Sequence, residues 1–263
     1  MSSVRKSFRL PTAQLGPDTV AIVTGAAEGL GKGFAECLLK KGAKGVCLSD
    51  INEPKGQETL RQLVAEFGQD RVMFVKCDVT SDSDMEATFS KTIEKFGRVN
   101  VMVNNAGLAN EREPEICYNV NIMGLTRGTF TAIKYMSPDN GGNGGKIINI
   151  ASMAGLWPIY LMPVYSASKH AVIGFTKSLA ADPQFASKGI TFSILCPGFV
   201  NTRIQEKARP QESDLRKMMK LQARLGVIEI SQVQDAFLQL LLDESWSGKV
   251  MLVSKQDGIK SAL

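Results

Sequence analysis

Histidine is almost absent from this chain, which has only His170 among its 263 residues. Zinc hydrolase sites with two or three histidine ligands are therefore excluded, and a Ser-His-Asp triad could form only around this residue. No G-x-S-x-G motif supplies a serine nucleophile for such a triad. The sequence argues against hydrolysis by the usual routes, and we expect no metal site.

Paired cysteines are lacking as well, because the five cysteines are odd in number and form no C-x-x-C motif. Most of them lie in apolar segments, which is typical of buried, reduced thiols. They are Cys37, Cys47, Cys77, Cys117 and Cys196.

Long hydrophobic runs and runs of like charge are also missing. Apolar runs are interrupted well before the roughly 18 residues that span a bilayer, and the N-terminal segment has no apolar stretch typical of a signal peptide. The net charge of +5, from 31 basic and 26 acidic residues, is scattered and not interleaved with aromatics. We expect no membrane span, no nucleic-acid partner and a cytoplasmic location.

The sequence does contain apolar, β-branched runs of strand length that alternate with amphipathic segments of helix length. Continuous hydrophobic runs joined by helices indicate strands buried on both faces, hence a parallel sheet with right-handed crossovers. The pattern predicts an α/β fold, a single Rossmann-like doubly wound domain of about seven parallel strands with helices on both faces. The runs are TVAIVTG, GVCLSDI, VMFVKCDV, VNVMVNNAG, GKIINIAS, ITFSILCPG and KVMLVSK.

No internal repeat or linker divides the chain, so residues 18–263 are expected to form one catalytic domain. Residues 1–17 carry Arg5, Lys6 and Arg9 but no acid, and are expected to be a disordered tail, with a mitochondrial presequence as the alternative. Residues 203–225 interrupt the alternation after the sixth strand and are expected to form a lid over the substrate.

The first strand ends in TGAAEGLGKG, which places Gly25, Gly29 and Gly31 at a strand-to-helix turn. Glycines there let the backbone approach a pyrophosphate, while the helix presents free N–H groups and its positive dipole end. The spacing G-x-x-x-G-x-G predicts a dinucleotide site. An ordinary glycine turn is the alternative.

Asp50 ends the second strand, about twenty residues past the last glycine, where an acid accepts hydrogen bonds from the adenosine ribose. Its carboxylate would repel a 2′-phosphate, and Glu28 adds a second negative charge, so NAD is favoured over NADP. Asp78, at the end of the third strand, lies in the same crevice and could reach the adenine. A simple turn role for Asp50 is the alternative.

A tyrosine and a lysine four residues apart occur in YSASK, residues 165–169. Side chains at this spacing lie on one face of a helix. A phenol with a pKa of about 10 is a weak base, but an ammonium beside it favours the phenolate. Tyr165 with Lys169 could therefore take the proton of an alcohol that is being oxidised. A half-exposed tyrosine with a solvated lysine is the alternative.

In their order along nearly the whole chain, these motifs resemble those of the short-chain dehydrogenase/reductase family. The resemblance implies that Lys169 also holds the nicotinamide ribose, that Ser152 binds the substrate oxygen and that Asn121 orients a proton-relaying water. It also places Leu30, Ile51, Cys77, Val79, Asn105, Tyr165, Val200 and Thr202 at the cofactor. The motifs are TGAAEGLG, NNAG, YNVNIMG, IINIASMAG, YSASK and PGFVNT.

The substrate side departs from the members that the chain resembles most, which carry a glutamine three residues before the catalytic tyrosine. Here Met162 occupies that position, and its thioether cannot donate a hydrogen bond. The apolar segment WPIYLM, residues 157–162, predicts a wall for a lipid-like secondary alcohol such as an oxylipin, an isoprenoid or a steroid. The expected substrate contacts are Ser152, Met162 and Tyr165.

Two other interpretations and one assembly state are considered. SASK, residues 166–169, fits the S-x-x-K pattern of penicillin-binding proteins, but S-D-N and K-T-G are missing. A non-catalytic NAD-binding scaffold would keep the glycine loop but has no need of Ser152, Tyr165 and Lys169. The resemblance implies a homodimer formed through the YSASK helix and a helix around residues 115–136.

Overall fold

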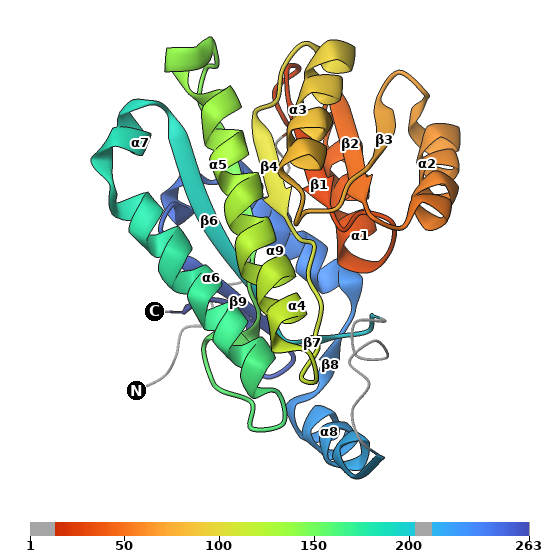
Figure 1. Ribbon diagram of the computed structural model, residues 1–263, viewed down its shortest axis with the longest axis vertical. Coiled ribbons are helices and arrows are strands. Elements are labelled where there is room, and N and C mark those ends of the chain that lie inside the picture. The colour runs from red at the N-terminus through yellow and green to blue at the C-terminus, as the bar shows by residue number, and fades with distance from the viewer. Residues whose placement is uncertain (1–13, 203–211, 263) are drawn as a thin grey trace.

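A twisted sheet forms the centre of the protein, whose computed structural model describes residues 14–202 and 212–262 (Figure 1). Within these residues the main sheet has eight strands in the order β10-β9-β6-β5-β4-β1-β2-β3. Seven of them are mutually parallel, and β10 pairs antiparallel with β9. The strands are β1 Val20–Thr24, β2 Gly45–Asp50, β3 Val72–Lys76, β4 Val101–Asn104, β5 Gly145–Ile150, β6 Ile190–Pro197, β9 Val250–Ser254 and β10 Gly258–Ala262.

Helices cover both faces of this sheet. One core cluster joins α1, α2 and α9 to the strands, and two further clusters join α3, α5 and α6 to the other face. In Figure 1, α5 and α6 lie in front of the sheet and α9 behind it. The helices are α1 Gly29–Lys40, α2 Glu53–Phe67, α3 Asp82–Phe96, α4 Pro114–Tyr118, α5 Leu125–Met136, α6 Pro163–Ala181, α7 Pro183–Ser187, α8 Glu212–Leu225 and α9 Ile230–Leu242.

The predicted doubly wound fold is confirmed, and each of the seven predicted runs is one of the seven parallel strands. Strand β1 is buried at every position, as expected for a strand covered by helices on both faces. The eighth strand, β10, was not predicted because its sequence, GIKSA, is not a hydrophobic run and lies half-exposed at the sheet edge. A second, two-stranded sheet pairs β7, Phe199–Val200, with β8, Val227–Ile228.

The predicted tail and lid are only partly described. Leu15, inside the predicted tail, donates its backbone N–H to the Lys41 carbonyl at 2.8 Å and packs against the core. The segments 1–13 and 203–211 lie outside the described residues, whereas α8 is described and projects beyond the lower end of the sheet (Figure 1). Every described helix is too short or too polar to cross a membrane. The cytoplasmic location stays a prediction.

Candidate active site

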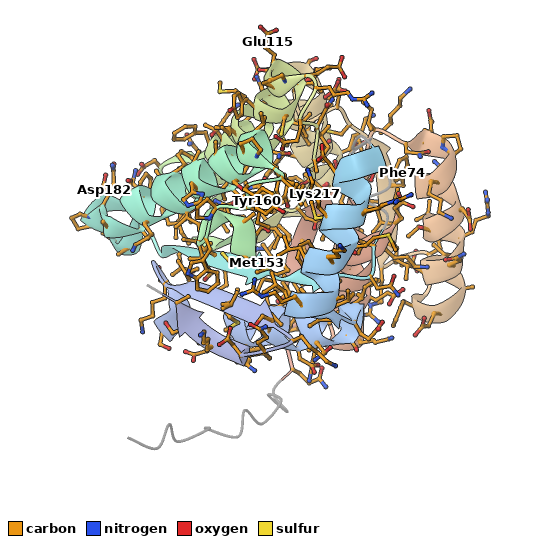
Figure 2. All side chains as sticks on the ribbon, turned by 90° about the horizontal axis from the view of Figure 1, so that it is seen from below. Phe74, Glu115, Met153, Tyr160, Asp182 and Lys217 are labelled. Carbon is orange, nitrogen blue, oxygen red and sulfur yellow. The ribbon has the colours of Figure 1, made fainter. Side chains whose placement is uncertain are left out.

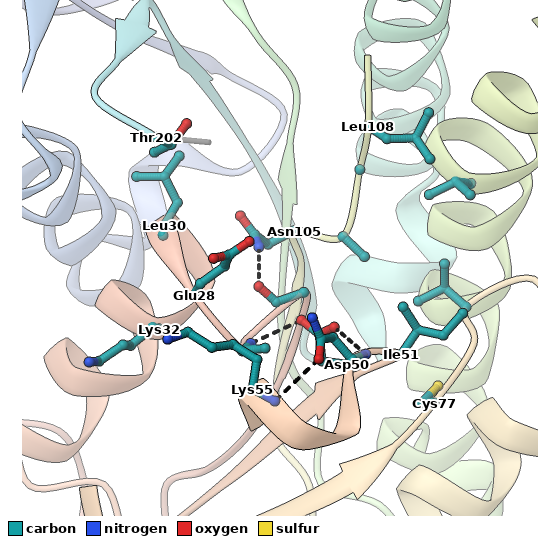
Figure 3. A pocket seen from close by; sticks show the side chains of 18 of the residues that line it. Glu28, Leu30, Lys32, Asp50, Ile51, Lys55, Cys77, Asn105, Leu108 and Thr202 are labelled. Atoms are coloured by element: carbon teal, nitrogen blue, oxygen red, sulfur yellow. Dashed lines mark hydrogen bonds between the residues drawn. The ribbon is translucent and has the colours of Figure 1, made fainter. Parts of the chain in front are cut away.

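A cavity of about 880 Å³ lies at the C-terminal ends of β1 to β4 (Figure 3). The glycine loop follows β1 there, and the NNAG segment begins at the end of β4. This is the crevice in which α/β sheets bind nucleotides. Eleven of the residues predicted from the sequence to bind the cofactor line it. They are Gly25, Glu28, Gly29, Leu30, Asp50, Ile51, Cys77, Asp78, Val79, Asn105 and Thr202.

The glycine loop needs glycine at each predicted position. Gly25 and Gly29 have positive φ angles of 63° and 59°, which side-chain-bearing residues rarely adopt. Gly31 does not line the cavity, because it packs under the loop, where an added Cβ would lie 2.1 Å from the Gly25 carbonyl oxygen. The loop therefore provides the close backbone approach that a dinucleotide requires.

Asp50 joins the glycine loop to the start of α2. Its carboxylate accepts hydrogen bonds from the backbone N–H groups of Ala27 and Asn52, both at 2.9 Å (Figure 3). This fixes a negative charge at the cavity wall, where the sequence predicts contact with the adenosine ribose. A carboxylate held in this way fits NAD better than a cofactor with a 2′-phosphate.

Asn105 holds two loops together rather than leaving its amide free. Its side chain donates to the carbonyl oxygens of Thr24 at 2.9 Å and Gly25 at 3.2 Å. The Thr24 hydroxyl in turn accepts hydrogen bonds from the N–H groups of Asn105 and Ala106, each at 3.0 Å. The NNAG segment thus shapes the cavity mainly by anchoring the glycine loop.

The predicted catalytic side chains meet at the N-terminal part of α6. Lys169 is 4% exposed and donates from Nζ to the Ile150 carbonyl at 2.9 Å. The same nitrogen lies 5.7 Å from the centre of the half-buried Tyr165 ring. Ser152 follows β5, and its hydroxyl accepts a hydrogen bond from the Ala154 N–H at 3.2 Å. The i,i+4 prediction for the Tyr-Lys pair therefore describes the geometry correctly.

Burial sets the proton affinities of this pair. It raises the pKa of Tyr165 to about 12, although a hydrogen bond with Ser152 works in the opposite direction. It lowers the pKa of Lys169 from 10.5 to about 8. Both shifts disfavour the charged forms, so the phenol of Tyr165 is protonated at neutral pH when no cofactor charge is nearby.

Asn121 lies in a π-helical turn, Asn119–Gly124, between α4 and α5. Such turns are frequent at functional sites. Its buried amide accepts from the Leu108 N–H at 2.9 Å and donates to the Leu108 carbonyl at 2.8 Å and the Ser168 hydroxyl at 3.0 Å. The side chain therefore links the loop after β4 to α6, and its role in orienting a water stays a prediction.

The substrate side is an apolar cluster in which Met162 is 8% exposed. Its buried members include Ile159 and Phe199, and Tyr165 packs against them. Trp157 and Tyr160 are 49% and 74% exposed and lie outside the cluster, so their place in the substrate wall stays a prediction. The α8 side chains in contact with the cluster are Met218, Leu221 and Leu225.

Some residues that the sequence assigns to the cofactor site do not line the cavity, and other residues that line it were not assigned. Val200 is buried in the core instead of lining the cavity, and Tyr165 and Lys169 lie outside its lining. Ala27 lies among the glycines, so the motif could have identified it as a cavity residue. The α2 residues have no local sequence signal, because only folding brings α2 to the cavity. The lining residues that the sequence did not assign include Ala27, Lys32, Asn52, Lys55, Thr59, Gln62, Thr80, Leu108, Ile116, Asn119, Val120, Asn201 and Ile230.

Comparison with known proteins agrees with this geometry. Residues 19–213 match the short chain dehydrogenase family, and the chain belongs to that family. It is 39% identical to the 15-hydroxyprostaglandin dehydrogenase [NAD(+)] of Mus musculus over 91% of each chain. Identity to the Homo sapiens enzyme of that name is 38%, over 91% of this chain and 92% of the relative. These identities confirm the resemblance to this enzyme that the segments FGRVNVMVNNAG and ASKHAVIGFTKS also suggest.

A solved structure shares the fold. It is a short chain dehydrogenase/reductase from Burkholderia phymatum in complex with NAD, with a TM-score of 0.78 and 29% sequence identity. The match covers 89% of this chain and 88% of the other.

Proposed function

We propose that this protein oxidises a secondary alcohol on a lipid-like substrate to the ketone, with NAD as the hydride acceptor, as 15-hydroxyprostaglandin dehydrogenases do. The observation that carries the proposal is the placement of Tyr165 and Lys169 on one face of α6, next to Ser152. The cavity beside them fits a dinucleotide at the glycine loop and at Asp50. The relatives named above support the same reaction.

Each side chain has a defined task in this reaction. Ser152 binds the substrate oxygen and directs its hydroxyl proton toward Oη of Tyr165, which removes that proton as a general base. Lys169 stabilises the phenolate by its positive charge. NAD, which the glycine loop and Asp50 would hold, would supply the acceptor for the hydride from the same carbon, and the positive charge of its nicotinamide would also favour the phenolate. The proton and the hydride together account for the conversion of alcohol to ketone.

The test is a screen of secondary alcohols, including hydroxy fatty acids, prostaglandins, isoprenoids and steroids, for NADH formation. We expect at least one class to be oxidised. We also expect NAD to support faster turnover than NADP at equal concentration, because Asp50 and Glu28 place negative charge at the cavity. The absence of NADH formation with every class, from folded protein that binds NAD, would favour a non-catalytic scaffold.

Met162→Gln is expected to raise activity on a prostaglandin 15-hydroxyl. Met162 belongs to the same apolar cluster as Tyr165, and a glutamine there supplies the donor that the thioether lacks. A hydrogen bond that strengthens in the transition state contributes about 1–2 kcal/mol, or about ten- to thirtyfold in kcat/KM. Steady-state NADH formation measures the change, and Met162→Leu, which adds no donor, should give no gain.

The outcome also decides the substrate class. If Met162→Gln leaves prostaglandin oxidation undetectable while the unmodified enzyme oxidises an isoprenoid or a steroid well, the cluster serves that other alcohol. The reaction and the cofactor would then stand, and the prostaglandin assignment would be wrong.

A homodimer is part of the proposal. It is supported by apolar side chains that α5 and the preceding π-helical turn expose, Phe130 and Met123, each 51% exposed. Phe130 also contacts Phe175 of α6 edge to face at 5.8 Å, which makes one aromatic surface across the two helices. A symmetric pair of these surfaces would form a four-helix interface. Light scattering should report twice the 28.5 kDa chain mass, and a monomer at micromolar concentration would refute the dimer.

A further inference from the structure

The helix that carries the catalytic pair has no N-terminal cap of its own. Met162, the residue before α6, makes no side-chain capping hydrogen bond, and Pro163 at the first helical position has no N–H. The next N–H groups, those of Val164 and Tyr165, precede the first intrahelical donor, since Ser166 N–H bonds to the Met162 carbonyl. The backbone of the catalytic tyrosine therefore needs an acceptor from elsewhere in the chain.

Glu111 provides that acceptor from the loop between β4 and α4. Its Oε2 accepts the Val164 N–H and its Oε1 accepts the Tyr165 N–H, both at 2.9 Å. These contacts join segments 53 and 54 residues apart in the sequence. A carboxylate at this end also interacts favourably with the positive end of the helix dipole. The side chain is half-buried, so water screens the contact only in part.

The loop that carries Glu111 also forms the cofactor cavity. Asn105 and Leu108, at its beginning, line that cavity. Its end is held in a turn by Asn110, whose side-chain oxygen accepts the N–H groups of Arg112 and Glu113, each at 3.1 Å. One loop therefore lines the cofactor cavity at one end and contacts the backbone of Tyr165 at the other.

We propose that Glu111 is a positioning residue for catalysis, which sets the place of Tyr165 relative to the cofactor cavity by holding the first turn of α6. This inference rests on the proposed function of Tyr165 as the base. Glu111 does not line the cofactor cavity, and it contacts the backbone of Tyr165 rather than its hydroxyl. Small displacements of a catalytic group reduce turnover strongly, because the reacting atoms must meet at a defined distance and angle.

The experiment compares Glu111→Ala with Glu111→Gln. The alanine removes both acceptors, and we expect kcat to fall about tenfold with the affinity for NAD, measured by calorimetry, changed less than about twofold. Glutamine keeps one acceptor oxygen and should restore most of the loss. A stability defect alone would not produce this separation of kcat from cofactor affinity or this rescue by the conservative variant.

Asp182→Ala is the matched control. Asp182 caps α7 by accepting the Gln184 N–H at 3.0 Å, so its loss also removes one helix cap. It lies at the opposite end of α6 from Tyr160, as Figure 2 shows. We expect this variant to keep the kcat of the unmodified protein.

A second readout does not depend on turnover. The amide protons of Val164 and Tyr165 should exchange with solvent slowly in the unmodified protein and at least about tenfold faster in Glu111→Ala. Unchanged exchange, or an unchanged kcat in Glu111→Ala, would overturn the inference. If the unmodified protein oxidises no alcohol, the proposed function fails, and amide exchange alone still decides whether Glu111 positions Tyr165.

Discussion

Tyr165→Phe is expected to reduce kcat/KM by at least about a hundredfold, because general-base catalysis by a positioned side chain contributes about 10²–10⁴-fold. Phenylalanine keeps the ring and its packing against Met162 but has no hydroxyl to exchange a proton. The cavity residues that fit NAD are untouched, so the affinity for NAD should be retained. Steady-state NADH formation and calorimetry measure the two properties.

Tyr135→Phe is the matched control for this substitution. The Tyr135 hydroxyl donates to Glu86 at 2.9 Å on the α3–α5 side of the sheet, so this variant also loses one hydrogen-bonded phenol oxygen. Its turnover should be close to that of the unmodified protein. Activity of Tyr165→Phe within about tenfold of the control would show that another group removes the proton.

The pKa of Tyr165 also determines the direction of the pH dependence. Burial raises this pKa to about 12, so the phenolate is the minor form at neutral pH and its population grows as the pH rises. The kcat/KM for alcohol oxidation should therefore increase with pH up to about 8, where Lys169 begins to lose the charge that stabilises the phenolate. A profile that falls between neutral pH and about pH 8 would contradict the assignment of Tyr165 as the base.

Lys169→Met is expected to inactivate the protein and, at the same time, to stabilise it in the absence of cofactor. A fall of the Lys169 pKa from 10.5 to about 8 corresponds to about 3 kcal/mol of unfavourable free energy for holding the charged side chain in the folded state. Methionine has a similar shape without the charge, although the Ile150 carbonyl loses its donor. We expect a net gain of about 1–2 kcal/mol, or about 2–8 °C in Tm.

The pH dependence of the stabilisation by Lys169→Met provides a sharper test. Because the folded-state pKa lies below the unfolded value, the unfavourable free energy is fully present below pH 8. It disappears as the pH rises toward 10.5. Thermal unfolding without cofactor should therefore show a larger gain for Lys169→Met at neutral pH than near pH 10. A lower Tm than the unmodified protein at neutral pH would contradict the argument.

Lys146→Met is the control for the loss of turnover. Burial lowers the pKa of Lys146 as well, and its Nζ donates to the Leu240 and Leu241 carbonyls, both at 3.0 Å. It is the second residue of β5, near the end of the strand opposite to Ser152, which follows the same strand. We expect Lys146→Met to keep its turnover, whereas Lys169→Met should lose it.

The sequence by itself determined the fold class and the groups of the site that depend on local spacing. Hydrophobic runs of strand length mark the seven parallel strands, because strands covered on both faces have no polar side to interrupt them. Three glycines after β1 and an acid at the end of β2 mark the nucleotide crevice, since a parallel sheet brings these strand ends together. Tyr165 and Lys169 share a helix face because the helix repeats every 3.6 residues.

Only the tertiary structure decided which distant residues hold these groups in place. The contacts of Glu111 with the Tyr165 backbone and of Asp50 with Ala27 join segments that have no fixed spacing, so no local pattern predicts them. The same holds for burial, which places the Val200 side chain in the core. Burial also raises the pKa of Tyr165 and lowers that of Lys169, because desolvation depends on everything packed around a side chain. The residues that we propose for the chemistry form local sequence patterns, whereas their positions and proton affinities come from contacts that exist only once the chain has folded.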